Sequence, residues 1–260
     1  PATAEGPPGG TSAAELGLTE LTDEPSRQDL FKYMIEDDKK NDPTRASRAQ
    51  TFALTMRFRF PDDARTDSAT NRPRVYSLFG VDISHHQSDK FPIEDLRAKG
   101  AIFLYMKASQ GETFVDGKFA SFWFRAGKLP KGRQVHRGAY HFLSAGDPAI
   151  PAEEWGRRQA LTFIKVIEAN NKPIGPNGPF RDTDMPPVMD LEWDASRTNP
   201  DRWKGRTPDE IIKMAKTFLE LVKARTKRTP MIYTAQSWWH VRIGQDSRLA
   251  ELAGYPIRLA

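Results

Sequence analysis

From residue 75 to its end, the sequence alternates short apolar segments with longer amphipathic ones, and this alternation constrains the fold most. The amphipathic stretches predict helices at 116–128, 153–170 and 207–225, the last with a capping box of Thr207 and Glu210. The short apolar segments predict strands, at residues 76–84, 101–109, 137–144, 186–193, 230–235 and 255–260. Strands that alternate with helices form βαβ units around a parallel sheet. We therefore expect an α/β fold, with an open sheet or a closed barrel.

Residues 1–74 have a different composition and lack this alternation. Residues 1–14 are rich in Pro, Gly and Ala and predict a disordered lead or linker. A short helix is predicted within residues 26–40, and the period-two apolar pattern of residues 51–60 predicts a strand. Polar, turn-rich residues 61–74 follow. We expect residues 1–74 to form an extension or linker region and residues 75–260 to form the main domain.

Charge and composition exclude several classes of function. The chain has 39 Lys and Arg against 34 Asp and Glu, and a net charge of +5 favours approach to polyanions such as cell-wall polymers. The basic residues are scattered, which disfavours nucleic acid as a partner. The absence of cysteine excludes disulfides, thiolate metal sites and a cysteine nucleophile.

No apolar run reaches transmembrane length, so we expect no stable membrane insertion. Because the chain begins at Pro1 without Met, export stays open.

Polar residues gather where the predicted strands end. In parallel α/β folds the active site lies at the carboxyl ends of the strands. The residues at these ends are Asp82, Ser84, His85, His86 and Gln87 for the first strand, Lys107 for the second, Tyr140 and His141 for the third, Asp190 and Glu192 for the fourth, and Tyr233 for the fifth. So many polar side chains at one edge of a sheet predict a pocket.

The segment "PPVMDLEWD" places three acids, Asp190, Glu192 and Asp194, two residues apart in an apolar strand. Such spacing puts side chains on one face. One interpretation is structural: Asp190 and Asp194 cap the following loop, and Glu192 pairs with a basic residue. The other is a carboxyl pair for acid/base chemistry, as glycoside hydrolysis requires, with the adjacent Trp193 suited to a sugar face. The residues alone leave both interpretations open.

A metal site is the main alternative at this edge. Asp82, His85, His86 and His141 are of the types that bind zinc or iron. However, adjacent histidines on a strand face opposite sides, and no HExxH spacing is present. We therefore favour hydrogen-bonded pocket or core histidines and expect no metal and no cofactor. Lys107 is interpreted as a buried ion-pair partner for the acids rather than a Schiff-base lysine.

Five motifs in order, "FGVDISHHQ", "FLYMKASQG", "RGAYHF", "PPVMDLEWD" and "PMIYTAQSWW", resemble the family 25 glycoside hydrolases, the Chalaropsis-type muramidases, from about residue 79 to residue 260. The resemblance implies an irregular, TIM-like (β/α) barrel. It also implies hydrolysis of the β-1,4 bond between N-acetylmuramic acid and N-acetylglucosamine in the glycan strands of peptidoglycan, by an exported protein or a phage-lysis product.

The resemblance also implies roles for individual residues. The family's Asp-x-Glu motif falls on Asp190 and Glu192, with Glu192 as general acid/base and Asp190 as a nucleophile or as a partner of the substrate's acetamido group. Asp82 is implied to line the catalytic pocket. We expect the substrate to be contacted by five further residues: Tyr140, Tyr233, Lys107, His141 and Gln110.

The sequence departs from the family pattern in two places. Gln110 stands where relatives commonly carry an acid, and the chain stops at Ala260 within the sixth strand, whereas relatives continue through two more strands. We expect the natural product to be longer. Two rival functions stay open: a peptidoglycan-binding barrel that has lost turnover, and a metal-dependent polysaccharide deacetylase that uses Asp82, His85, His86 and His141. Nucleic-acid binding is the least favoured.

Overall fold

The computed structural model describes residues 66–67, 72–73, 80–99, 101–199, 201–244 and 246–259. The expected lead at 1–14, helix within 26–40 and strand at 51–60 lie outside the described residues. Within the turn-rich segment 61–74, strands β1 (Thr66–Asp67) and β2 (Arg72–Pro73) pair antiparallel.

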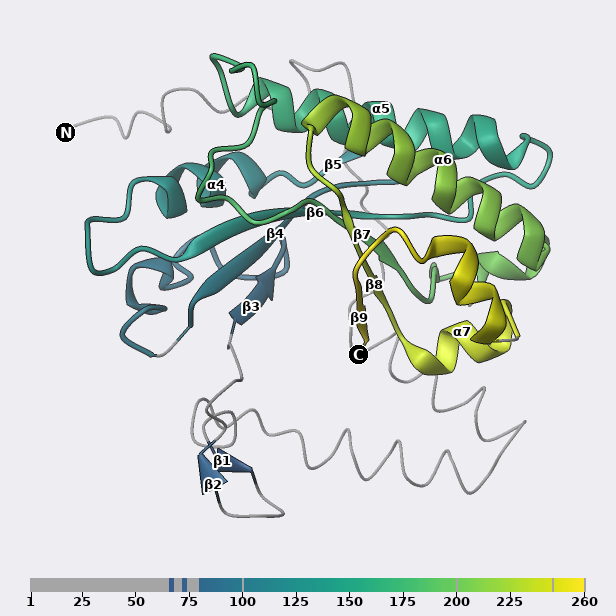
Figure 1. Ribbon diagram of the computed structural model, residues 1–260, viewed down its shortest axis with the longest axis horizontal. Coiled ribbons are helices and arrows are strands. Elements are labelled where there is room, and N and C mark those ends of the chain that lie inside the picture. Colours follow the sequence, from purple (N-terminus) through teal and green to yellow (C-terminus); the bar gives the residue numbers. More distant parts are fainter. Residues whose placement is uncertain are drawn as a thin grey trace.

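The main sheet is built from six parallel strands in sequence order (Figure 1). They are β3 (Gly80–Ile83), β4 (Phe103–Gln110), β6 (His136–Phe142), β7 (Val188–Leu191), β8 (Met231–Thr234) and β9 (Ile257–Leu259). Each of the six expected strands is confirmed, and every neighbouring pair is parallel. A short strand, β5 (Phe114–Val115), pairs antiparallel with the end of β4. The described strands thus form a curled parallel sheet, a half-barrel.

Helices cover the outer face of this sheet. The three expected helices are confirmed within a few residues as α4 (Phe119–Gly127), α5 (Ala152–Ala169) and α6 (Pro208–Thr226). The sequence did not predict α7 (Gln236–Arg242) or the 3-10 helices η1 (Ile93–Asp95), η2 (Arg202–Gly205) and η3 (Asp246–Leu252). Across the described part of the chain, no helix combines the length and the apolar character needed to cross a membrane.

The capping box predicted for the third helix is present at the start of α6. The Thr207 backbone N–H donates to Glu210 Oε2 at 2.8 Å, and the Glu210 N–H donates to Thr207 Oγ1 at 3.3 Å. These bonds satisfy two of the amide groups that a helix leaves unpaired at its first turn. The start of α6 is therefore fixed by local sequence.

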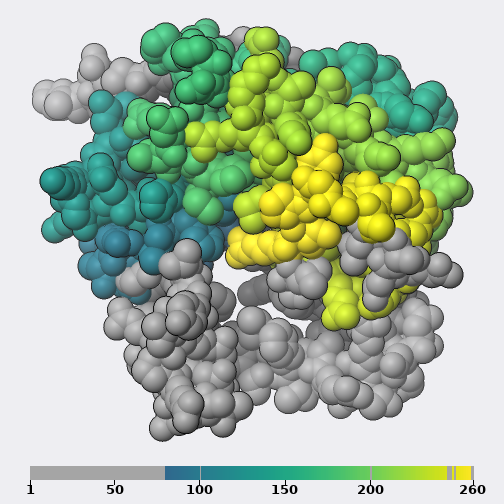
Figure 2. All heavy atoms as spheres, viewed as in Figure 1, coloured from purple at the N-terminus to yellow at the C-terminus, as the bar shows by residue number. Residues whose placement is uncertain are grey.

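The hydrophobic core lies between the sheet and its helices. In Figure 1, α5 and α6 run side by side above the curled sheet, and α4 lies over β4. Seven of the eight residues of β4 are buried, because this strand is covered on both faces. In Figure 2, the atoms of α5, α6 and the C-terminal segment form a closely packed surface on the face in view. Residues at or next to the strand ends, such as Ile83, Leu143 and Leu191, belong to the hydrophobic core.

Two glycines shape the concave face of the sheet. Gly80 of β3 pairs with Phe103, and Gly138 of β6 pairs with Tyr105, so the two glycines flank β4. A Cβ atom added at either position would lie 2.2 Å from the ring of its partner. Because glycine has no side chain, the two aromatic rings can lie across the neighbouring strands.

Candidate active site

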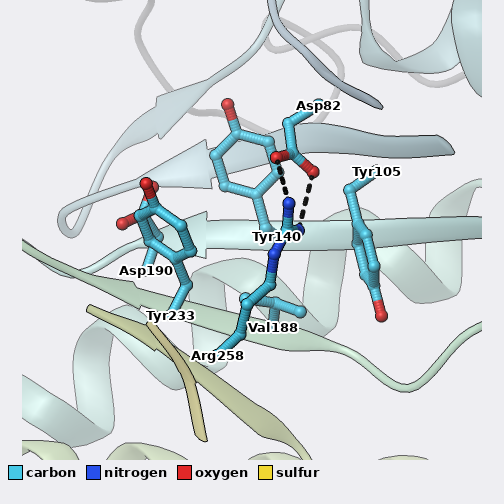
Figure 3. Close-up of a pocket in the computed structure, with 7 residues that line it drawn as sticks. All are labelled: Asp82, Tyr105, Tyr140, Val188, Asp190, Tyr233 and Arg258. Carbon is cyan, nitrogen blue, oxygen red and sulfur yellow. Dashed lines mark hydrogen bonds and ion pairs between the residues drawn. The ribbon is translucent and has the colours of Figure 1, made fainter. Parts of the chain in front are cut away.

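A pocket opens on the concave face, inside the curl of the sheet (Figure 3). All six parallel strands contribute to its lining, which consists of Asp82, Tyr105, Tyr140, Val188, Asp190, Tyr233 and Arg258. Successive strands present their inward positions in register: Tyr140 lies beside Val188, and Asp190 lies beside Tyr233. Four of the residues expected at the site, Asp82, Tyr140, Asp190 and Tyr233, are brought together here.

Asp82 forms an ion pair with Arg258 across the pocket. Arg258 Nη2 lies 3.2 Å from Asp82 Oδ2, and Nη1 lies 3.3 Å from Oδ1. The guanidinium carbon lies 5.7 Å from the ring centroids of both Tyr233 and Phe103. Sequence reasoning missed Arg258. The only signal was its place in the sixth predicted strand, where any side chain has an even chance of facing inward.

Asp190 and Glu192 lie at the end of β7. Asp190 is 5% exposed, and its backbone carbonyl accepts a hydrogen bond of 2.8 Å from the Leu143 N–H. Glu192 follows the last residue of the strand and is partly exposed. Its carbonyl accepts a 2.8 Å hydrogen bond from the Trp203 indole. The main chain at both acids is thus anchored by neighbouring segments.

Lys107 brings a positive charge toward these acids. Its side chain is buried on β4, donates to the side chain of Gln110, and lies 5.4 and 5.1 Å from the ring centroids of Phe114 and Phe142. Burial lowers the pKa of Lys107 to about 8, although the negative charges of nearby acids oppose this shift; they are Asp116, Asp190, Glu192 and Asp194. Lys107 and Gln110 therefore lie at the same end of the sheet as Asp190 and Glu192.

His141 does not reach the pocket, contrary to the expectation that it contacts substrate. Its neighbour Tyr140 points inward, so His141 points to the opposite face of β6. There it is fully buried, with Nδ1 2.8 Å from Ser109 Oγ and its ring stacked on Phe218 at 4.9 Å. Burial lowers the pKa of His141 to about 3, so the ring is neutral in the core.

His85 and His86 lie in the loop after β3. His85 is oriented by the buried Asp116, whose Oδ2 lies 2.8 Å from the His85 backbone nitrogen and 3.0 Å from ring Nδ1. The rings of His85 and His86 are 4.1 Å apart. Over the described ranges, no group of three or more His, Cys, Asp or Glu residues is arranged to hold a metal ion. The four residues of the metal-site alternative are therefore not brought together as a site.

Asp194 lies in the loop after β7 and is buried. Its Oδ2 accepts hydrogen bonds from Ser144 Oγ at 2.7 Å and from the Ala145 N–H at 2.8 Å. Burial raises the pKa of Asp194, while the Arg202 charge and these hydrogen bonds act in the opposite direction. Asp194 thus joins the loop after β7 to the loop after β6.

Comparison with known proteins gives a consistent set of matches. The family model described as glycosyl hydrolases family 25 matches residues 81–257. An N,O-diacetylmuramidase from Chalaropsis sp. is 31% identical over 168 residues, which cover 65% of this chain and 71% of that protein. Lysozyme M1 from Streptomyces globisporus is 30% identical over 172 residues, which cover 66% of this chain and 51% of that protein.

Solved structures agree with these sequence matches. The muramidase from Trichobolus zukalii superposes with a TM-score of 0.55 at 27% identity, covering 70% of this chain and 76% of that chain. The lysozyme from Streptomyces coelicolor superposes with a TM-score of 0.54 at 26% identity, covering 70% and 73%. An uncharacterized protein from Escherichia coli is 27% identical over 175 residues. The chain spans about half of that relative's length, 53%.

Proposed function

The chain belongs to glycosyl hydrolase family 25, and from this premise we propose that it is a peptidoglycan hydrolase of the N-acetylmuramidase type. It cleaves the β-1,4 bond between N-acetylmuramic acid and N-acetylglucosamine. The observation that carries this proposal is the carboxyl pair at the end of β7, where Asp190 lines the pocket and Glu192 follows it on the edge where the strands end. Two of the relatives are named as a muramidase and a lysozyme, which supports the same reaction.

In this mechanism Glu192 is the general acid. It gives its proton to the glycosidic oxygen as the bond to the anomeric carbon breaks, and the resulting carboxylate then takes a proton from the attacking water. Asp190 stabilises the positive charge that develops at the anomeric carbon, as a nucleophile or by orienting the substrate's acetamido group. Burial of Asp190 strengthens such an electrostatic effect, because the surroundings are less polarisable than water.

The other pocket residues bind and orient the sugar. Asp82, fixed by Arg258, offers carboxylate oxygens to sugar hydroxyl or amide groups. Tyr140 and Tyr233 supply ring faces and hydroxyl groups on two neighbouring walls, and Lys107 and Gln110 supply polar groups at the strand ends. We omit His141 from this set because its ring is enclosed in the core.

The proposal extends to the whole protein. We propose that the curled sheet belongs to an irregular, TIM-like (β/α) barrel, as family membership implies. Residues 75–260 are the catalytic region, and residues 1–74 are an extension. The substrate lies outside the cytoplasm, so the protein acts after export or at the cell envelope. The net charge of +5 supports approach to an anionic cell wall.

The test is digestion of purified peptidoglycan with identification of the new ends. We expect new reducing ends that are N-acetylmuramic acid, found by borohydride reduction and mass spectrometry. Glu192→Gln keeps the shape of the side chain but cannot donate the proton, so kcat falls by about 10²- to 10⁴-fold. The matched control is Glu220→Gln, the same substitution at an exposed position on α6.

Three outcomes would replace this proposal. Binding of peptidoglycan in a sedimentation assay without release of reducing ends favours a binding module. Release of acetate that a chelator abolishes favours a metal-dependent deacetylase instead. Reducing ends that are N-acetylglucosamine would assign the opposite bond specificity.

A further inference from the structure

A buried tryptophan holds the main chain at Glu192. Trp203 lies in η2, eleven residues further along the chain, and its indole N–H donates a 2.8 Å hydrogen bond to the Glu192 carbonyl oxygen. The side chain has no solvent exposure. This bond reaches the segment immediately after β7, because the last residue of that strand in the ladder is Leu191, paired with Thr234.

The indole of Trp203 is itself fixed in place. The Trp203 backbone N–H donates to Asp201 Oδ1 at 3.1 Å, and the buried Asp201 carboxylate pairs with Arg242 of α7. The Trp203 ring packs edge-on against Trp238, with the centroids 5.4 Å apart. Trp203 is thus held by a hydrogen bond to Asp201, which is itself paired with Arg242, and by a ring contact, so its indole has little freedom to move and the carbonyl that it binds is held as well.

Trp238 provides an internal comparison. It belongs to the same cluster and is also fully buried. Its indole nitrogen makes no hydrogen bond with any residue that the structure describes. The two tryptophans are therefore both fully buried and packed against each other, but only the Trp203 indole donates a hydrogen bond to the Glu192 carbonyl.

We propose that Trp203 is a positioning residue for the proposed general acid Glu192. The proposal rests on the muramidase function proposed above. A general acid must lie within hydrogen-bond reach of the leaving oxygen, and a displacement of about 1 Å lowers the rate by roughly 100-fold. Loss of the indole N–H leaves the Glu192 carbonyl without this donor, and the segment shifts to find another partner. The carboxyl group moves with it.

The test compares Trp203→Phe with Trp238→Phe in the full chain. Both substitutions remove an indole from the same buried cluster, so both lower the melting temperature. Only Trp203→Phe removes the bond to Glu192. We expect kcat on purified peptidoglycan to fall roughly tenfold in Trp203→Phe with KM unchanged. In Trp238→Phe, which keeps an aromatic ring against Trp203 and leaves the bond to Glu192 in place, kcat should stay within about twofold of wild type. Both variants are assayed well below their melting temperatures.

A second variant keeps the test decisive if a phenylalanine leaves a cavity that prevents folding. Trp203→benzothienylalanine replaces the indole N–H by sulfur in a ring of nearly the same shape, and it should lower kcat while leaving the melting temperature close to wild type. Equal kcat values in the Trp203 and Trp238 variants, with an active wild-type protein, overturn the positioning role alone. A wild-type protein that releases no muramic acid ends overturns the proposed function, and the positioning role with it.

Discussion

Arg258 in β9 and Asp82 in β3 form a two-point ion pair, with nitrogen–oxygen distances of 3.2 and 3.3 Å. The two residues are 176 positions apart in the sequence, and their strands are the first and last of the curled sheet. The pair therefore ties the two edges of the half-barrel together across the pocket, in addition to holding an acid that we assign to the site.

Breaking this pair should cost stability in a manner that depends on salt. The Arg258 side chain is 36% exposed and that of Asp82 is 19% exposed, so water screens part of the attraction. We expect a double-mutant cycle with Arg258→Met and Asp82→Asn to give a coupling free energy of about 1 kcal/mol, smaller in 1 M salt. Urea unfolding of the four proteins measures it. Purely additive costs would show that the pair contributes no coupling.

Lys107 should make stability depend on pH in the alkaline range. Its pKa is about 8 in the folded protein and higher in the unfolded chain, so the unfolded chain holds more protons between these values. The stability of wild type relative to Lys107→Met therefore rises with pH above about 8, by up to roughly 1.4 kcal/mol per pH unit. Chemical unfolding from pH 7 to 10 checks this, with Lys131→Met as an exposed control. If the stability of wild type relative to Lys107→Met instead falls as the pH rises over this range, the pKa of Lys107 is not lowered in the folded protein.

His141 should make the protein sensitive to acid. Its pKa is about 3 in the folded protein and near 6.5 in the unfolded chain. Between these pH values His141 is protonated in the unfolded chain but neutral in the folded protein. This contribution is fully present above pH 6.5 and is lost as the pH falls toward 3. His141→Gln does not titrate, so the stability advantage of wild type should shrink between pH 7 and 4. A constant difference across this range would place the ring in contact with water.

Arg206 should anchor the loop that follows β6. Its buried guanidinium donates to the carbonyl oxygens of Asp147 at 2.6 Å, Ile150 at 2.8 Å and Ala145 at 3.1 Å. Arg206→Lys keeps the charge but cannot reach these acceptors together, and we expect a loss of about 2–4 kcal/mol in the free energy of unfolding. Hydrogen exchange should accelerate at residues 144–150. Unchanged exchange there would show that other contacts hold the loop.

Periodicity made much of this fold predictable. The six strands and three long helices follow from patterns that repeat over several residues, and the cap at Thr207 is a local signal. Helix α7 was missed because its seven residues, "QSWWHVR", are too few and too aromatic to show a helical period. Short elements of this kind are fixed by packing, here through the buried Trp238 and Trp239.

The site was predictable where strand geometry decides it, and not elsewhere. Period two was applied to the acids of the fourth strand, and Asp190 does line the pocket. It was not applied to the third strand, where it separates Tyr140, which lines the pocket, from the adjacent His141, which turns away. Arg258 was marked only by its place in the sixth predicted strand, and Trp203 gave no local signal. Each acts through a partner set by the three-dimensional fold, Asp82 for Arg258 and the Glu192 carbonyl for Trp203.

Gly138 leaves room for an aromatic ring of the pocket wall because it has no side chain. Tyr105, which lines the pocket, lies across this glycine, where one added carbon would fall 2.2 Å from the ring. Alanine at position 138 would require the Tyr105 ring to shift, and this ring lines the pocket. A single methyl group at position 138 would therefore alter the proposed sugar-binding pocket while every acid stays in place, and a comparison of the acidic motifs alone would not detect that change.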